Sequence, residues 1–264
     1  MDRFLIVGDH EVMQPDATTR FTPRVADYRQ YRPGYPRAIL ALLERECGLA
    51  ARASVADVGC GTGLLARLFL DYGCAVWGVE PNAGMRAAAE ELFAAEDRFH
   101  SVNGRAESTT LPDAGFDFVT AGQAFHWFDA AAAGLEFQRI LKPAGWLVLV
   151  WNERHRSPGF MADYEEVIRD YAPEKTRIDE SAIDRVFGGR RWSLAQFANH
   201  QRLDLAGLAG RVASSSYAPL PGAPGYRPLA DELERLFEKH QEGGSVTLAY
   251  DTKVYWGSPG GANP

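Results

Sequence analysis

The chain has 264 residues, a formal net charge of −7 and a sequence pI of about 5.4. Its hydrophobic content of 46% and charged content of 24% are ordinary for a globular enzyme, and its acidic balance gives no bulk electrostatic reason to bind nucleic acid or an anionic membrane. The three cysteines (Cys47, Cys60 and Cys74) form no zinc or disulfide pattern, so we expect no metal and a reducing, cytoplasmic compartment.

The first part of the chain alternates apolar runs with helical segments. We expect residues 1–20 to form a loosely held N-terminal arm. Near-continuous apolar strands separated by helices indicate a parallel sheet covered on both faces. The predicted strands are residues 54–58, 75–80, 99–102, 116–121 and 146–151, and the predicted helices are residues 64–72, 83–95 and 130–141.

The regular alternation of strands and helices ends after residue 152. Helices are predicted over residues 159–172, 178–187 and 229–241, and strands over residues 200–205 and 246–256. The last strand has no clear parallel crossover, so we expect it to join the sheet antiparallel. No apolar run approaches the ~18 residues of a membrane span, and no membrane association is expected.

A glycine-dense turn joins the first strand to its helix, with Gly59, Gly61 and Gly63 in alternation. Such a backbone can approach a ligand closely, and the helix that follows points free N–H groups at it. The dinucleotide fingerprint requires a further glycine at the position of Leu64, which makes a nicotinamide or flavin enzyme less favoured. Glu80 ends the second strand, where an acid can accept the hydroxyls of a ribose or cap a helix.

The ordered blocks 57–63, 78–82 with Met85, 104–107 and 116–119 resemble the signatures of class I S-adenosylmethionine-dependent methyltransferases. The flanking segments resemble the small-molecule branch of this class, which includes the type 11 and trans-aconitate methyltransferases. Those segments are residues 31–36, 123–128 and 214–219.

The resemblance implies a Rossmann-like three-layer α/β sandwich with a seven-stranded, mostly parallel sheet and a helical cap. It implies one methyltransferase domain over residues 21–256, with a lid at 21–36, a cap insertion at 154–197 and a flexible tail at 257–264.

The resemblance also implies roles for individual residues around the methyl donor. The residues it places at the cofactor are Asp57, Gly59, Cys60, Gly61, Glu80, Pro81, Met85, Ala106, Glu107, Gln123 and Ala124. Asp57, Gly59 and Gly61 hold the methionine end, whereas Glu80 holds the ribose. Pro81 and Met85 pack against the adenine, Ala106 and Glu107 address its edge, and Gln123 and Ala124 offer carbonyl oxygens near the amino group.

His126 is the candidate general base, because it follows the fourth strand and its side chain titrates near neutral pH; it can equally be part of the pocket wall. The aromatic arm before residue 36 is expected to fold over the site as a lid that excludes water, or else to be a surface arm. Candidate substrate-binding residues are Tyr28, Tyr31, Arg32, Tyr35, Trp127, Trp151, Asn152 and Tyr217. Arg32 and Arg154 are the candidate partners of a substrate carboxylate.

These features predict an S-adenosylmethionine-dependent methyltransferase that releases S-adenosylhomocysteine and acts in line on an O, N or C nucleophile of a small molecule. The loop at 122–125 lacks the Asn/Asp-Pro-Pro-Tyr motif of enzymes that methylate base nitrogens, so nucleic acid is not expected as a substrate. The alternatives are a carboxylate O-methyltransferase, a nicotinamide-dependent oxidoreductase and a non-catalytic cofactor-binding subunit. We expect a monomer or a homodimer.

Overall fold

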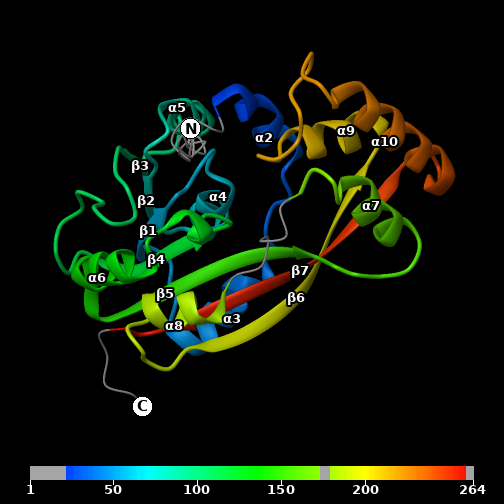
Figure 1. Ribbon diagram of the computed structural model, residues 1–264. Coiled ribbons are helices and arrows are strands. Elements are labelled where there is room, and N and C mark those ends of the chain that lie inside the picture. The colour runs from blue at the N-terminus through cyan, green and yellow to red at the C-terminus, as the bar shows by residue number, and fades with distance from the viewer. Residues whose placement is uncertain (1–21, 173–178, 260–264) are drawn as a thin grey trace, which may run out of the picture.

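A computed structural model describes residues 22–172 and 179–259 of the chain (Figure 1). The strands are β1 (Ser54–Val58), β2 (Ala75–Val79), β3 (Phe99–Val102), β4 (Phe116–Gly122), β5 (Leu141–Arg154), β6 (Ser193–Leu203) and β7 (Val246–Gly257). The helices are η1 (Thr22–Arg24), α2 (Val25–Tyr31), α3 (Ala38–Cys47), α4 (Leu64–Tyr72), α5 (Ala83–Leu92), η2 (Phe125–Trp127), α6 (Ala130–Ile140), α7 (Phe160–Ile168), α8 (Glu180–Val186), α9 (Leu205–Ala213) and α10 (Tyr226–His240).

The strands form a 7-stranded sheet in the order β3-β2-β1-β4-β5-β7-β6. The neighbours from β3 to β5 pair in parallel, whereas β7 is antiparallel to both β5 and β6. The predicted α/β sandwich with one antiparallel strand, the last in the chain, is therefore confirmed. The parallel strands bring their carboxyl ends to one edge of the sheet, where ligands of such folds bind.

Helices cover both faces of the sheet. They are needed on both faces because successive side chains of a strand point to opposite sides and both sides are apolar here. On β1, Val55 belongs to a core shared with α3, α4 and α5, whereas the next residue, Ala56, belongs to a core shared with α6 and α8. Helix α4 begins after Gly63, which has a φ of +89°, and ends at Gly73, which has a φ of +108°. These left-handed positions suit glycine and account for the sharp boundaries of the helix.

A third core lies beyond the parallel strands, where α7, α9 and α10 pack over the far ends of β6 and β7 (Figure 1). The helical cap therefore includes segments outside the expected range 154–197. Within that range, α8 instead packs on α6, and β6 begins at Ser193 as part of the sheet. The expected arm at 1–20 and residues 260–264 of the expected tail lie outside the described residues.

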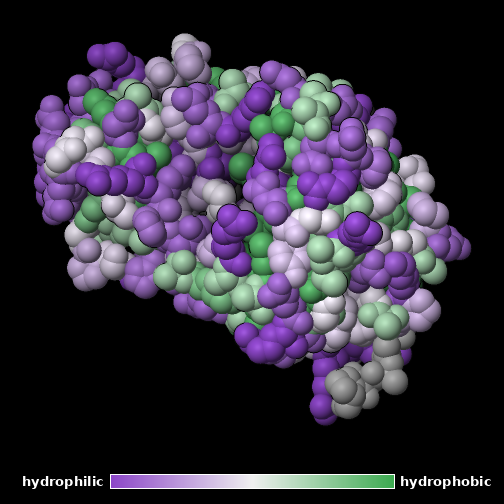
Figure 2. Space-filling view, turned by 180° about the vertical axis from the view of Figure 1, so that it is seen from behind, coloured by the Kyte–Doolittle hydropathy of each residue, from purple (hydrophilic) through white to green (hydrophobic). Residues whose placement is uncertain are grey.

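None of the helices in the described ranges is both long enough and apolar enough to cross a membrane. On the face seen in Figure 2, hydrophilic side chains interrupt the hydrophobic areas. The most exposed large apolar side chain among the described residues is Leu135, which is 72% exposed.

Candidate functional site

The glycine turn lies at the carboxyl edge of the sheet, between β1 and α4, and all three of its glycines have positive φ. A Cβ on Gly59 would come within 2.5 Å of the Ala124 Cβ, and a Cβ on Gly63 would collide with the Phe93 ring. At Gly61 the nearest atom to such a Cβ is Met85 Cε at 3.6 Å, so the backbone there is the least crowded of the three. Close packing fixes the two ends of the turn, while its middle leaves room beside the backbone.

Asp57 is the last but one residue of β1 and is fully buried. Its Oδ1 accepts a hydrogen bond of 2.9 Å from Thr120 Oγ1, whereas Oδ2 has no hydrogen-bond partner among the described residues. Burial, helped by the negative charge of Glu80, raises the pKa of Asp57 to about 7. A buried carboxylate oxygen without a partner is rare and costly, so this atom is an acceptor prepared for a ligand donor or cation.

Glu80 directly follows β2 and is 9% exposed. Its Oε2 accepts a hydrogen bond from Gly61 N at 3.0 Å, and its Oε1 accepts one from Asn82 N at 2.8 Å. Each oxygen keeps a second lone pair, so the carboxylate can still accept two hydroxyl donors. Burial raises the pKa of Glu80 in spite of these hydrogen bonds. The fixed carboxylate suits a vicinal diol such as that of a ribose.

The start of α5 completes this side of the crevice. Asn82 caps the helix, because its Oδ1 accepts a hydrogen bond from Met85 N at 3.0 Å. Met85 is 4% exposed and its methyl group lies beside Gly61, while Pro81, directly after Glu80, is half-buried. An apolar thioether next to the glycine turn provides a flat apolar surface of the kind that an adenine ring needs.

Ala106 and Glu107 lie in a tight turn in which Arg105 and Ser108 exchange backbone hydrogen bonds. Ala106 is 4% exposed. Glu107 accepts a hydrogen bond from Asp129 N at 2.9 Å and lies 3.7 Å from the Arg105 guanidinium. In this structure the Glu107 carboxylate therefore binds the segment that begins α6.

The loop after β4 packs directly on the glycine turn through Ala124 and Phe128. Gln123 has a φ of +55°, which is unusual for a residue with a Cβ. Its side chain exchanges two hydrogen bonds with the backbone of Asn152, at 3.1 Å and 3.2 Å. Cross-strand pairing thus holds this backbone in a strained conformation, as is common at ligand-binding loops.

His126 lies in the short helix η2 and is exposed to solvent. Its ring centroid is 4.7 Å from that of Trp127 and 5.1 Å from that of Trp151, against which it makes an edge contact. Trp151 is 7% exposed. The predicted base and two predicted substrate residues therefore form one aromatic cluster, open on the side of the histidine.

The segment from η1 to residue 36 lies across the carboxyl edge and touches both the sheet and the helical cap. Tyr35 lies against the end of β4, because its hydroxyl would meet a Cβ on Gly122 at 2.6 Å. Burial, with smaller contributions from Tyr28 and Asp57, raises the pKa of the Tyr35 hydroxyl well above its ordinary value. The tyrosine is therefore a neutral group beside the buried carboxyl group.

Other candidate substrate residues lie farther from the turn. Tyr31 packs against Gly210 of α9, where any Cβ would collide with its ring. Asn152 is 5% exposed, and its Nδ2 donates to Gly34 O at 3.2 Å, which ties the arm to the sheet. Arg32 and Tyr217 belong to a buried arginine and tyrosine cluster between the arm and the cap.

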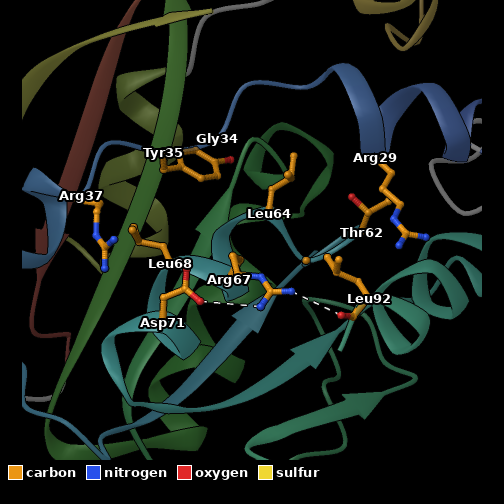
Figure 3. A pocket seen from close by; sticks show the side chains of 11 residues that line it. Arg29, Gly34, Tyr35, Arg37, Thr62, Leu64, Arg67, Leu68, Asp71 and Leu92 are labelled. Carbon is orange, nitrogen blue, oxygen red and sulfur yellow. Dashed lines mark hydrogen bonds and ion pairs between the residues drawn. The ribbon is translucent and has the colours of Figure 1, made fainter. Parts of the chain in front are cut away.

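A pocket of about 420 Å³ opens between the arm and α4 (Figure 3). In Figure 3 the Tyr35 ring lies on one side of it and Arg29 reaches in from α2, while Arg67 is held by Asp71 and by the carbonyl oxygen of Leu92. The pocket touches the glycine turn only at its helix side. The pocket's lining comprises Arg29, Gly34, Tyr35, Arg37, Thr62, Gly63, Leu64, Arg67, Leu68, Asp71 and Leu92.

The sequence does not single out Thr120, Tyr164 or Arg211, although Thr120 holds the Asp57 carboxyl group and the other two form part of the buried cluster. These three are recognisable only once distant segments come together. Asn82, whose backbone N–H holds Glu80, lies within the signature block 78–82. Cys60 is buried, and burial raises the pKa of its thiol well above the ordinary value, which keeps the thiol neutral and disfavours a thiolate nucleophile.

Residues 56–149 match the family model described as a methyltransferase domain. The chain is 33% identical over 227 residues to an uncharacterized methyltransferase of Mycobacterium bovis, covering 85% of this chain and 88% of the relative. It is 31% identical over 221 residues to a malonyl-[acyl-carrier protein] O-methyltransferase of Pseudescherichia vulneris, covering 82% of this chain and 85% of the relative.

A solved structure assigned to the type II methyltransferases, from Anaeromyxobacter dehalogenans, aligns with a TM-score of 0.66. The alignment covers 87% of this chain and 98% of that one at 21% identity, so it supports the fold alone.

Proposed function

The chain belongs to the class I S-adenosylmethionine-dependent methyltransferases, and from that premise we propose that it methylates an O, N or C nucleophile of a small molecule. S-adenosylmethionine supplies an activated methyl group on a sulfonium, with S-adenosylhomocysteine as the product. The protein's own contribution is then to bind the donor, orient the acceptor and exclude water.

The observation that carries this proposal is the pair of buried carboxyl groups on either side of the glycine turn. The unpartnered Oδ2 of Asp57 suits the ammonium of the donor's methionine end, and Glu80 suits the ribose hydroxyls. Gly61 leaves room for the ligand beside the backbone, and Met85 offers an apolar contact for the base. The remaining candidate cofactor contacts are Gly59, Cys60, Pro81, Ala106, Glu107, Gln123 and Ala124.

His126 is the proposed general base for acceptors whose nucleophile carries a proton. The open side of its aromatic cluster lets the imidazole reach an acceptor, and an imidazole accepts protons near neutral pH. The arm from residue 22 to 36 is the proposed lid. Its contacts to both Gly122 and α9 support a role in closing the site to water.

Carboxylate O-methylation is the second candidate reaction. The similarity to malonyl-[acyl-carrier protein] O-methyltransferases and the buried arginines near the arm favour it. An ionised carboxylate needs no general base, so His126 would then only shape the pocket wall. We further propose that the chain acts as a monomer or homodimer, independently of nucleic acid and membranes.

Transfer of a labelled methyl group from S-adenosylmethionine to a fractionated small-molecule extract tests the function. We expect label in a small-molecule fraction with the wild-type chain and none with the Asp57→Ala variant. Equal labelling by the two proteins, or no acceptor in any extract despite tight donor binding, would contradict the proposal. The second result would favour a non-catalytic binding subunit.

A further inference from the structure

Three arginines converge where the arm meets the helical cap. Arg32 directly follows α2, Arg154 ends β5, and Arg211 lies in α9. Arg211 is 4% exposed and the Arg154 side chain is 16% exposed. Buried guanidinium groups are costly unless they are paired, so their partners decide what this cluster does.

One of the three arginines is neutralised within the protein. Arg154 forms an ion pair with Glu165, in which its Nε donates to Oε1 and its Nη2 donates to Oε2. Within residues 22–172 and 179–259, neither Arg32 nor Arg211 has an ion pair with a carboxylate. The cluster therefore holds one buried and one partly buried positive charge without a carboxylate counter-ion.

The hydrogen bonds of Arg32 and Arg211 are made to neutral groups. Arg211 Nε donates to the Tyr250 hydroxyl at 3.1 Å, and its Nη1 donates to Ser215 Oγ at 3.1 Å. Arg32 Nη2 donates to Ser214 O at 2.9 Å. Neutral acceptors fix the positions of the guanidinium groups and leave their charge uncompensated.

Two further polar atoms in the cluster are buried without a hydrogen-bond partner in the described part of the chain. They are Arg32 Nε and the Tyr164 hydroxyl. Both can donate a hydrogen bond. Burial alone would raise the pKa of Tyr217, but the charges of Arg154 and Arg211, a hydrogen bond with Ser215 and the charge of Arg32 outweigh it and lower that pKa. Positive charge and unused donors thus gather in one place.

The cluster adjoins the proposed donor site through a single side chain. The Arg32 guanidinium carbon lies 4.8 Å from the centre of the Tyr28 ring. Tyr28 Cε1 lies 4.0 Å from the Cβ position of Gly61, in the middle of the glycine turn. A small molecule held in the cluster therefore lies next to the place where the methyl donor is proposed to bind.

We propose that Arg32, Arg211, Tyr164 and Tyr217 form a carboxylate-binding subsite that anchors an anionic methyl acceptor. This inference rests on the proposed function, since it assigns the acceptor of that reaction to a chemical class. A carboxylate matches the guanidinium in charge and geometry and accepts from the unused donors of Arg32 and Tyr164. The bound carboxylate has its lone pairs engaged, so it orients the acceptor while another group of the same molecule receives the methyl.

A structural role for the cluster makes a different prediction. If the arginines only hold the arm to the cap, the hydroxyl of Tyr164 has no task, and nothing should respond to added carboxylates. Tyr164 provides the cleanest test, because removal of an unpartnered hydroxyl leaves the packing of the ring unchanged. Tyr250 is the matched control, since its hydroxyl accepts from Arg211.

The test measures the thermal midpoint with sodium malonate, succinate and benzoate, against the matched amides and sodium chloride at equal ionic strength. We expect at least one acid to stabilise the wild-type protein while its amide does not. The variant Tyr164→Phe should bind that acid about tenfold more weakly, because hydrogen bonds to a charged group are strong. Its urea midpoint without ligand should not fall, whereas that of Tyr250→Phe should.

Calorimetric titration with S-adenosylhomocysteine on the same proteins separates the two proposals. Unchanged affinity in Tyr164→Phe, together with weaker acid binding, supports the subsite. Wild-type protein that fails to bind S-adenosylhomocysteine would overturn the proposed function instead. The subsite is refuted if no acid stabilises the wild-type protein beyond chloride, if Tyr164→Phe responds equally, or if removal of the Tyr164 hydroxyl lowers the urea midpoint.

Discussion

Replacing Asp57 by asparagine should stabilise the ligand-free protein at neutral and alkaline pH while abolishing its affinity for the methyl donor. The carboxyl group is fully buried and one of its oxygens has no partner in the described residues. Asparagine keeps an oxygen for the hydrogen bond from Thr120 and removes the buried charge. The same change deletes the group proposed to hold the donor's ammonium.

The magnitude follows from the pKa of Asp57, which rises from 3.8 to about 7 on folding. An acid whose pKa is raised binds more protons in the folded than in the unfolded state, so the free energy of unfolding falls as pH rises from 3.8 to 7. A shift of about 3 units at 1.36 kcal/mol each gives a loss of about 4 kcal/mol above pH 7. The variant lacks this loss.

Urea unfolding of the wild-type and Asp57→Asn proteins at pH 4, 6 and 8 measures this difference. We expect the stability of the variant relative to wild type to rise by about 4 kcal/mol between pH 4 and pH 8. The affinity of the wild-type protein for S-adenosylhomocysteine should also rise with pH across the same range. A stability difference that is independent of pH would show that Asp57 has an ordinary pKa and would refute the reasoning.

The remaining predictions concern the turn, the base and the arm. Gly59→Ala should cost about 2–4 kcal/mol in urea unfolding and prevent donor binding, because its φ is +69° and the new Cβ would crowd Ala124; a stable variant with normal affinity would contradict the geometry. His126→Asn should lower kcat about a hundredfold without changing donor affinity; unchanged kcat would favour carboxylate methylation. Asn152→Ala should cost about 2–3 kcal/mol and expose the arm to proteolysis, because it removes one of the two amide hydrogen bonds to the Gly34 carbonyl and leaves the buried Thr252 hydroxyl without its acceptor; an equally resistant arm would refute this contact.

The best-predicted parts of the fold are those with local signals at both ends. Strand β1 and helix α4 have the bounds expected from the sequence, since glycines mark the turn between them and the end of the helix. Strand β6 is the clearest difference, because the sequence indicated only its last part. It is an edge strand with half of its residues exposed, so its polar residues give no apolar run to recognise.

The candidate site likewise has a part that local sequence signals predict and a part that they do not. Asp57, Glu80 and the glycine turn are close in sequence to strand ends, so their meeting at the carboxyl edge follows from a parallel sheet. The arginine and tyrosine cluster joins residues from the arm, β5, α7 and α9, whose packing has no local signature. Arg32 was identifiable as a candidate, whereas Arg211 and Tyr164 became recognisable only when the cap was seen folded against the arm.

The most direct test of the whole account is calorimetric titration of the wild-type chain and of Glu80→Gln with S-adenosylhomocysteine and with NAD. We expect one site for S-adenosylhomocysteine on the wild-type protein and no binding of NAD. Glu80→Gln should bind S-adenosylhomocysteine at least tenfold more weakly, because its amide loses one acceptor for the ribose diol. Tight binding of NAD with no binding of S-adenosylhomocysteine would contradict the account.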